Sequence, residues 1–277
     1  MLMSTQINRY AHQLLDARIE ARLMPPLTSG FALTQDDAYD IARRIHDVRV
    51  AEGEVPVGRK IGFVNRTVWP RNAQDPTVHA PIWSPLFDRT VIYTEDNAAL
   101  IHIKELMQPR IEPEIVFRLA KSPALDCTMD ELADCIEWMA HGIEINSCPF
   151  PDWQFKTADA IAAFGLHGML IIGEPRVVSA QSRRHLATMM MGVSVSLSSD
   201  GTLRSAGFGS DILNSPLHAL WHLHQMLCNQ TRFAPLAAGE IITTGAWTDA
   251  KTAEPRQIWQ TAFSGIALDG MTVELVE

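Results

Sequence analysis

The chain has 277 residues, of which 47% are hydrophobic and 20% are charged. This composition supplies enough apolar side chains for a large core and excludes an extended disordered protein. The formal net charge is −9, which disfavours a nucleic-acid-binding protein, because phosphate backbones are bound by clustered lysines and arginines. No apolar stretch approaches the roughly 18 residues of a membrane-spanning helix, and residues 1–10 lack the apolar segment of a signal peptide.

These features predict a soluble, cytoplasmic protein with neither a nucleic-acid nor a membrane partner. The cysteines agree with a reducing compartment, because they show no C-x-x-C spacing and their neighbours are mostly apolar. We therefore interpret them as reduced core thiols rather than as disulfides or zinc ligands. They are Cys127, Cys135, Cys148 and Cys228.

The N-terminal region shows two amphipathic helical patterns. The first covers residues 4–24, where apolar side chains recur at helical spacing until a proline pair ends the pattern. The second begins at Thr34, which with Asp37 resembles a capping box, and it continues to Gly53. We expect residues 1–55 to form a helical cap whose apolar stripes pack over the rest of the protein.

After residue 56 the pattern changes to short apolar runs separated by Gly, Pro, Asn and Asp, which is typical of β-strands. Asp-Gly pairs at 200–201 and 269–270 indicate tight hairpin turns, so part of the sheet is expected to be antiparallel. The predicted strands are residues 61–64, 91–93, 115–119, 169–172, 193–197, 241–244 and 271–276.

Two helices are expected to interrupt these strands. Thr128 with Glu131 caps one that is predicted to run to about Ala140, and Ser215, followed by a proline, starts another that runs to about Cys228. The predicted fold class is therefore α+β. It combines the helical cap with one β-rich domain, residues 56–277.

The segment with the clearest chemical pattern contains Glu112 and Glu114 in a run of β-branched and aromatic residues. In a strand, two residues at this spacing lie on one face with Cα atoms roughly 6.5 Å apart. Their charges repel unless a cation lies between them, and the intervening Pro113 favours an edge strand or a bulge. The same spacing also fits a solvent-facing strip, so it does not establish a metal site by itself.

A third acid, Glu144, lies in another short apolar run. Three carboxylates suit magnesium, manganese or calcium better than zinc, because no His or Cys completes the set. Two lysines, Lys60 and Lys156, lie in apolar or aromatic surroundings. Each is interpreted either as a surface lysine that extends its charged end to water or as a cation that binds substrate.

Five segments are informative in combination: G-R-K-I-G-F, R-I-E-P-E-I-V-F, G-I-E-I, D-W-Q-F-K-T-A-D-A-I-A and L-A-A-G-E-I-I-T-T-G-A-W-T. Their order and spacing resemble the 2-oxopent-4-enoate hydratase and 4-oxalocrotonate decarboxylase branch of the fumarylacetoacetate hydrolase superfamily, over about residues 5–276. The resemblance implies the mixed, β-rich fold of that superfamily. It also implies that Glu112, Glu114 and Glu144 hold Mg²⁺ or Mn²⁺.

The same resemblance implies catalytic roles for Lys60 and for the K-x-x-D pair Lys156 and Asp159. The implied function is a metal-dependent lyase of aromatic-compound catabolism that acts on a small 2-oxo acid through an enolate, as a hydratase of 2-oxo-alkenoates or a decarboxylase of 2-oxo dioates. One alternative is a C–C bond hydrolase of an acylpyruvate. Another is a non-enzymatic assembly subunit that keeps the fold. A homo-oligomer is expected, and so is a possible complex with a related catabolic enzyme.

The chain departs from the branch at two places. Hydratases of this branch usually carry P-D-Y-G, whereas Ile82 stands where the aspartate is expected. The branch's A-D-N is replaced by Ala162, Ala163 and Phe164. Both changes predict a more apolar pocket and disfavour water addition.

Several other motifs are interpreted as structural. His167 could face the pocket, but a hydrogen-bonded histidine of the fold is the favoured interpretation. His218 and His222 lie at i, i+4 but lack the glutamate of the H-E-x-x-H motif. Gly207-x-Gly209 lacks the rest of a dinucleotide fingerprint, so no nicotinamide site is expected.

Overall fold

The computed structural model describes residues 2–68 and 80–277. The α-helices are α1 (Ser4–Ile19), α2 (Gln35–Ala51), α3 (Met129–Asp134), α4 (Thr157–Ala162), α5 (Ala180–Arg183), α6 (Leu186–Met191) and α7 (Pro216–Cys228). The strands are β1 (Pro56–Gly62), β2 (Ile82–Phe87), β3 (Val91–Tyr93), β4 (Ala98–His102), β5 (Arg110–Leu119), β6 (Ile136–Asn146), β7 (His167–Ile172), β8 (Arg176–Val177), β9 (Ser194–Ser199), β10 (Thr202–Phe208), β11 (Ile241–Thr243), β12 (Lys251–Thr252), β13 (Ile258–Ser264) and β14 (Thr272–Val276).

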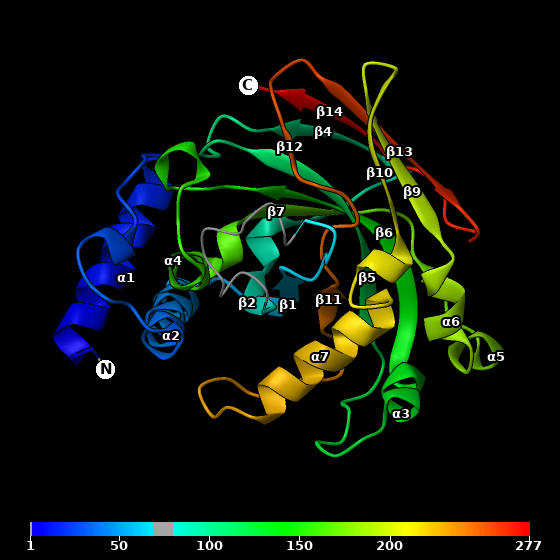
Figure 1. Ribbon diagram of the computed structural model, residues 1–277, viewed down its shortest axis with the longest axis horizontal. Helices are drawn as coiled ribbons and strands as arrows, with labels where there is room; N and C mark the ends of the chain where they lie inside the picture. The colour runs from blue at the N-terminus through cyan, green and yellow to red at the C-terminus, as the bar shows by residue number, and fades with distance from the viewer. Residues whose placement is uncertain (1, 69–79) are drawn as a thin grey trace.

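The strands form two sheets. The larger one has the order β2-β1-β11-β5-β6-β7-β3, with β12 also paired to β5 and β8 to β6, and the smaller one has the order β10-β9-β13-β14-β4. One buried cluster contains side chains from both sheets, such as Ile143 and Val273, so the sheets pack face to face. Figure 1 shows the smaller sheet at the upper right and α7 below the larger sheet. These features confirm the predicted mixed α+β class.

Apolar residues at odd-numbered positions of β5 lie on one face of the strand, and its two glutamates lie on the other. Ile111, Ile115 and Phe117 enter hydrophobic clusters. Because successive side chains of a strand alternate between faces, Glu112 and Glu114 point to the opposite face. This alternation sets the position of the candidate site.

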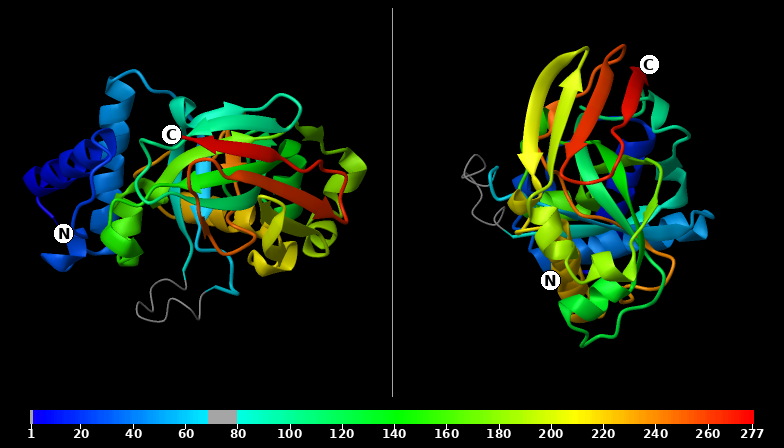
Figure 2. Two further views of the ribbon diagram at one scale, coloured as in Figure 1. Left: turned by 90° about the horizontal axis from the view of Figure 1, so that it is seen from above. Right: turned by 90° about the vertical axis from the view of Figure 1, so that its right-hand side faces the viewer.

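The two N-terminal helices lie at one end of the sheets rather than over them (Figure 2). Their buried side chains, among them Leu14 and Ile41, share one hydrophobic cluster with Ile161 of α4 and Phe87 of β2. The predicted helical cap therefore has a core in common with the rest of the chain. The division at residues 55 and 56 stays a prediction.

The predicted helix from Thr128 to Ala140 is wrong in its second half. The capping box of Thr128 and Glu131 forms as expected, but the helix ends at Asp134, and β6 begins at Ile136. Residues 136–146 instead pair with β5 and β7 in the larger sheet. This tertiary pairing outweighs the local helical pattern, which extends only two turns.

Other boundaries differ by a few residues. Helix α1 ends at Ile19 rather than at residue 24, and Ala21 has a positive φ of 47° just beyond it. The Asp-Gly pair at 200–201 joins β9 to β10 as a hairpin, as predicted. The pair at 269–270 lies in the longer connection between β13 and β14.

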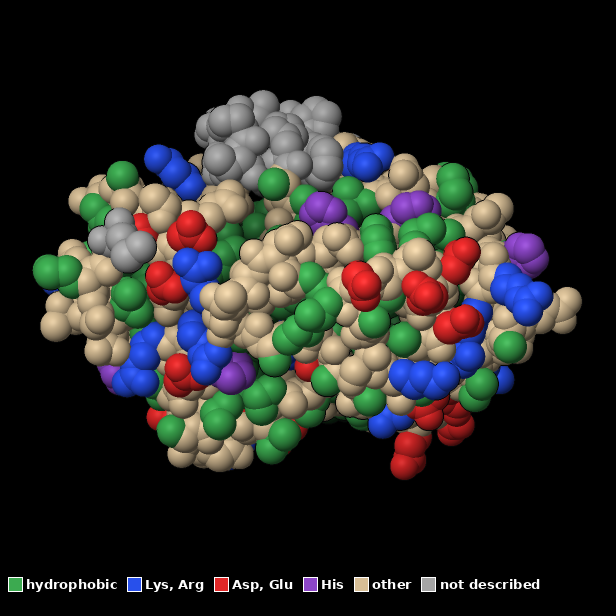
Figure 3. All heavy atoms as spheres, turned by 90° about the horizontal axis from the view of Figure 1, so that it is seen from below, with side chains coloured by type: hydrophobic (Ala, Val, Ile, Leu, Met, Phe, Trp, Pro, Cys, Tyr) green, Lys and Arg blue, Asp and Glu red, His purple; other side chains and the backbone are tan. Residues whose placement is uncertain are grey.

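Acidic and basic side chains are mixed on the face in Figure 3, with hydrophobic side chains between them, and the described part of this face shows no continuous basic area. Nucleic-acid binding relies on such an area. None of the helices within residues 2–68 and 80–277 is long and apolar enough to cross a membrane.

Candidate metal centre and active site

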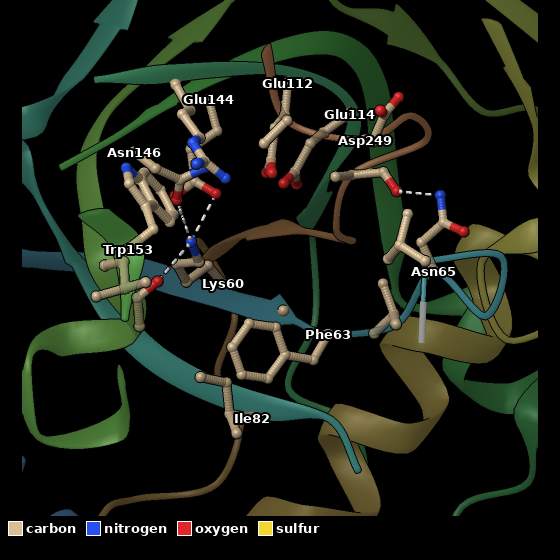
Figure 4. A pocket seen from close by; sticks show the side chains of 18 of the residues that line it. Lys60, Phe63, Asn65, Ile82, Glu112, Glu114, Glu144, Asn146, Trp153 and Asp249 are labelled. Atoms are coloured by element: carbon tan, nitrogen blue, oxygen red, sulfur yellow. Dashed lines mark hydrogen bonds and ion pairs between the residues drawn. The ribbon is translucent and has the colours of Figure 1, made fainter. Parts of the chain in front are cut away.

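The candidate site is built on the pairing of β5 with β6. In this antiparallel pair Glu112 lies opposite Glu144, and Arg110 lies opposite Asn146. Directly paired residues of neighbouring strands point to the same face, so Glu112, Glu114 and Glu144 converge. One carboxylate oxygen from each of the three lies within 4.8 Å of the other two. Figure 4 shows all three carboxylates directed at one space.

Pro113 lies within this acidic segment, yet β5 is not an edge strand as the proline suggested. Strand β5 pairs with β11 only at Val116–Arg118 and with β12 only at Arg110 and Ile111. Pro113 lies in the interval between these two pairings, where its lack of an N–H removes no ladder hydrogen bond. Its carbonyl accepts a hydrogen bond from the Trp247 N–H.

The protein strongly orients two of the three carboxylates. Glu114 accepts hydrogen bonds from the Thr243 hydroxyl and the Gly245 N–H, both on the same oxygen, Oε2. Its other oxygen is left to face the cluster. Glu144 accepts from Lys60 Nζ at 2.7 and 2.6 Å and lies 2.6 Å from His167 Nδ1.

The electrostatics of the cluster are those of a cation site. Burial, followed by the charge of Glu144, raises the pKa of Glu112 to about 7 and raises the pKa of Glu114 well above its usual value. Burial also opposes ionisation of Glu144, but Lys60 and His167 outweigh it and lower the pKa of Glu144 to about 2. One ammonium group thus faces three carboxylates, and a divalent ion at this point would remove the remaining repulsion.

Lys60 belongs to the same site. Strand β1 places it beside Thr243 of β11, and its side chain is buried with only 4% of the residue exposed. Besides Glu144, its Nζ donates to the Gly165 carbonyl at 3.0 Å and the Asn146 side-chain oxygen at 3.3 Å. The prediction from the resemblance thus coincides with a buried cation in the pocket.

Lys156 and Asp159 are not brought to this site. Lys156 is exposed at the N-terminus of α4 and does not line the pocket. Asp159 is fully buried, where it accepts hydrogen bonds from the Thr28 N–H, the Thr28 hydroxyl and the Lys156 N–H. These contacts make Asp159 an anchor of α4, so the geometry does not support the catalytic roles predicted for this pair.

The carboxylates and Lys60 line a pocket of about 500 Å³. Its apolar wall includes Phe63, Ile82 and Leu166, so Ile82 lies in the pocket as the sequence predicted. On another side of the pocket the guanidinium of Arg110 stacks on the Trp153 ring at 4.0 Å. Within residues 2–68 and 80–277 the Arg110 guanidinium has no hydrogen-bond or ion-pair partner, so it can bind an anionic ligand in the pocket.

Sequence reasoning missed Arg110, Asn146 and Trp153. The alternation of side chains along β5 could have identified Arg110, because residues 110 and 112 lie on the same face of a strand. Trp153 could not be found in this way. Its ring reaches Arg110 through two successive left-handed residues, Asp152 and Trp153, with φ of 55° and 58°.

Residues 63–268, most of the chain, match the family described as fumarylacetoacetate (FAA) hydrolase, C-terminal. The chain belongs to the fumarylacetoacetate hydrolase family. This confirms the resemblance seen in the sequence. The match begins beyond α2, so the N-terminal helices lie outside the part that the family description covers.

Relatives within the family belong to the expected branch. The chain is 30% identical over 243 residues to 2-hydroxyhexa-2,4-dienoate hydratase of Comamonas testosteroni, covering 87% of each chain. It is 27% identical over 250 residues to 4-oxalocrotonate decarboxylase of a Pseudomonas species, covering 90% of this chain and 91% of the relative.

The fold agrees with a solved structure, 4-oxalocrotonate decarboxylase from Pseudomonas putida G7 complexed with magnesium and adipate. The TM-score is 0.87 at 22% identity, covering 100% of this chain and 99% of that chain. The similarity spans the N-terminal helices as well as the family domain. It confirms the predicted fold, including the helical N-terminal region.

Proposed function

We propose that this protein is a divalent-metal-dependent lyase that acts on a small 2-oxo acid. One observation carries the proposal: three convergent carboxylates and the buried Lys60 line a single pocket. The hydratase and decarboxylase relatives support the same reaction class. A C–C bond hydrolase of an acylpyruvate receives less support, and a non-enzymatic assembly subunit has no physical reason to keep this buried cluster.

Glu112, Glu114 and Glu144 would hold Mg²⁺ or Mn²⁺, because oxygen ligands suit these hard cations. The bound ion supplies Lewis-acid stabilisation of the negative charge that develops on the 2-oxo oxygen. The protein's contribution is the fixed orientation of the ligands. Thr243 and Gly245 orient Glu114, and Lys60 orients Glu144.

The remaining pocket residues would bind and orient the substrate. Arg110 faces the pocket as a planar cation held by Trp153, so it would bind a substrate carboxylate. Lys60 would hold a proton at Nζ beside the oxygen that gains charge. Phe63, Ile82 and Leu166 would exclude water from the carbon chain of the substrate.

Between the two lyase reactions, Ile82 favours decarboxylation. Hydration needs a group that activates or delivers water, and an apolar side chain stands where hydratases of the branch usually carry an aspartate. Decarboxylation needs none. The C–C bond to the departing carboxylate breaks, CO₂ leaves, the electron pair enters the enolate, and a proton from a neighbouring donor completes the product. An apolar wall favours this loss of a charged carboxylate as neutral CO₂.

The proposal is tested by incubating the purified protein with Mg²⁺ or Mn²⁺ and a panel of 2-oxo-alkenoates and 2-oxo dioates, with products identified by mass spectrometry. We expect a 2-oxo dioate to lose CO₂, and we expect EDTA or Glu114→Gln to stop the reaction. The exposed Glu105 provides a matched control, Glu105→Gln, that should remain active. Turnover that persists in EDTA and in Glu114→Gln would refute the metal-dependent mechanism.

We also propose that the protein is cytoplasmic and works as a homo-oligomer, possibly in a complex with a related catabolic enzyme. The N-terminal region exposes several large hydrophobic side chains that an oligomer could cover, which supports this proposal: Met3, Ile19, Leu23, Val50 and Val55. Size-exclusion chromatography with light scattering checks this. A mass of 30.8 kDa, that of one chain, at micromolar concentration would contradict the oligomer.

A further inference from the structure

A short segment, Phe164 to Gly168, carries two of the contacts that organise the candidate site. The Gly165 carbonyl accepts a hydrogen bond from Lys60 Nζ at 3.0 Å. His167 Nδ1 lies 2.6 Å from Glu144 Oε1. Because an ionised carboxylate only accepts hydrogen bonds, His167 donates from Nδ1. The position of this segment therefore helps to fix the ammonium group of Lys60 and the carboxylate of Glu144.

The segment has an unusual backbone. Phe164, Gly165 and Leu166 are three successive residues in the left-handed region, with φ of 58°, 61° and 60°. Two of them have side chains, and such residues cost on the order of 1 to 3 kcal/mol each. A conformation of this kind persists only where surrounding contacts hold it in place. The contacts that hold this segment in its strained conformation therefore also help to position Lys60 and Glu144.

Helix α1 supplies one of these contacts. Arg18 donates from Nη1 to the His167 carbonyl at 2.7 Å and from Nη2 to the Gly168 carbonyl at 3.2 Å. The contact joins residues that are about 150 positions apart in the sequence. It fixes the backbone of the same residue, His167, whose side chain bonds to Glu144.

Helix α2 supplies a second contact, on the other end of the segment. The guanidinium carbon of Arg49 lies 3.9 Å above the Phe87 ring and 5.4 Å from the centre of the Phe164 ring. The two rings stack at 5.8 Å. Glu54 holds Arg49 in place through two hydrogen bonds of 2.8 and 2.7 Å. Phe164 is also one of the residues that replace the branch's A-D-N, so this stack belongs to a part of the chain that departs from the branch.

We infer that Arg18 and Arg49 are positioning residues of the active site, and that the N-terminal helices complete the site by holding the strained segment Phe164 to Gly168 against Lys60 and Glu144. This inference rests on the proposed function, since it assigns the two arginines to the proposed metal and substrate site. Neither arginine touches the pocket that holds the carboxylates. They act through the Gly165 carbonyl and the His167 side chain.

The inference is tested with Arg18→Met, which keeps an unbranched side chain and removes both hydrogen bonds. Mn²⁺ affinity is measured by isothermal titration calorimetry at a temperature where the variant is folded by circular dichroism. Removing a partner that orients a metal ligand typically weakens metal binding by roughly 10- to 100-fold, and we expect about 10-fold here. At saturating Mn²⁺ we expect kcat for the 2-oxo acid to fall more than KM rises, because Lys60 is displaced.

Arg22→Met is the matched control, because Arg22 follows the same helix, is exposed and forms an ion pair with the exposed Glu20. It should leave Mn²⁺ affinity and kcat within twofold of the wild type. Arg18→Lys keeps a donor and should recover Mn²⁺ affinity to within about threefold. A role in stability alone would lower the melting temperature of Arg18→Met without moving its Mn²⁺ affinity.

Phe164→Leu tests the second contact independently and serves if Arg18→Met does not fold. It removes the ring that stacks on Phe87 and should weaken Mn²⁺ binding in the same direction. The inference is overturned if folded Arg18→Met and Phe164→Leu both bind Mn²⁺ as tightly as the wild type. If the wild-type protein itself binds no Mn²⁺, the proposed function fails together with the inference that rests on it, which is a different and recognisable result.

Discussion

The substitution Glu112→Gln should stabilise the metal-free protein and, at the same time, abolish the stabilisation that metal provides. Burial and the neighbouring Glu144 raise the pKa of Glu112 from 4.5 to about 7. At about 1.36 kcal/mol per pKa unit, keeping this group ionised at pH 8 costs the folded state about 3 kcal/mol. A glutamine of nearly the same shape removes this cost. For a chain of this size, that corresponds to a melting temperature higher by several degrees.

The stability difference between the wild type and Glu112→Gln should depend on pH. Because the pKa is raised in the folded state, the wild type loses stability relative to the variant as pH rises from about 4.5 to about 7. The advantage of Glu112→Gln should therefore be absent below pH 4.5 and complete above pH 7.

Metal reverses the order of the two proteins. With Mg²⁺ at about 1,000 times its Kd, the wild type should gain about 4.1 kcal/mol, more than the roughly 3 kcal/mol cost of the ionised Glu112, whereas the variant, which lacks one ligand, should gain little. The assay is thermal unfolding by circular dichroism with EDTA or Mg²⁺ at pH 4.5, 6 and 8, and Glu105→Gln is the control for a neutralised surface acid. The reasoning is refuted if Glu112→Gln is the less stable protein in EDTA at pH 8, or if it keeps the full response to Mg²⁺.

The remaining predictions concern single residues of the pocket and use steady-state kinetics at saturating Mg²⁺. Lys60→Met should lower kcat roughly 100-fold or more, as is typical for loss of one preorganised donor. Lys156→Met should change kcat less than threefold. A larger loss of kcat in Lys156→Met than in Lys60→Met would restore the catalytic role predicted for Lys156. Ile82→Asp should add or raise water addition to 2-oxopent-4-enoate while Mg²⁺ affinity stays nearly constant. Strong hydratase activity in the wild type, unaffected by this substitution, would show that another group supplies the proton. Arg110→Met should raise KM for the 2-oxo acid about 10-fold, in the range of a lost charge-assisted hydrogen bond. The distant surface variant Arg176→Met should leave KM unchanged. An unchanged KM in Arg110→Met would show that Arg110 does not bind the substrate.

Much of the candidate site could be predicted from the sequence because its signals are local. Glu112 and Glu114 share a face through the period of a strand, and that period survives in the folded protein. The motif around Lys60 also marks a residue that the structure places in the pocket. The helix caps at Thr34, Thr128 and Ser215 form as expected, since each depends only on neighbouring backbone groups.

Other features depended on contacts between distant parts of the chain. The local sequence pattern predicted that the helix after Thr128 continues to about Ala140. Pairing with β5 instead makes residues 136–146 a central strand. Lys156 and Asp159 have the spacing of a catalytic pair, yet the Thr28 hydrogen bonds turn Asp159 into an anchor between the N-terminal region and α4. No local signal distinguishes these two outcomes.

The sequence by itself therefore determined the family, the α+β class and the acidic residues of one strand face, because these follow from motif order and side-chain period. Only the tertiary structure decided which cations join those acids. Lys60 reaches Glu144 across 84 positions of sequence, and Arg18 reaches the His167 carbonyl across 149. Such contacts form when strands and helices pack, and packing is a property of the whole chain rather than of any segment of it.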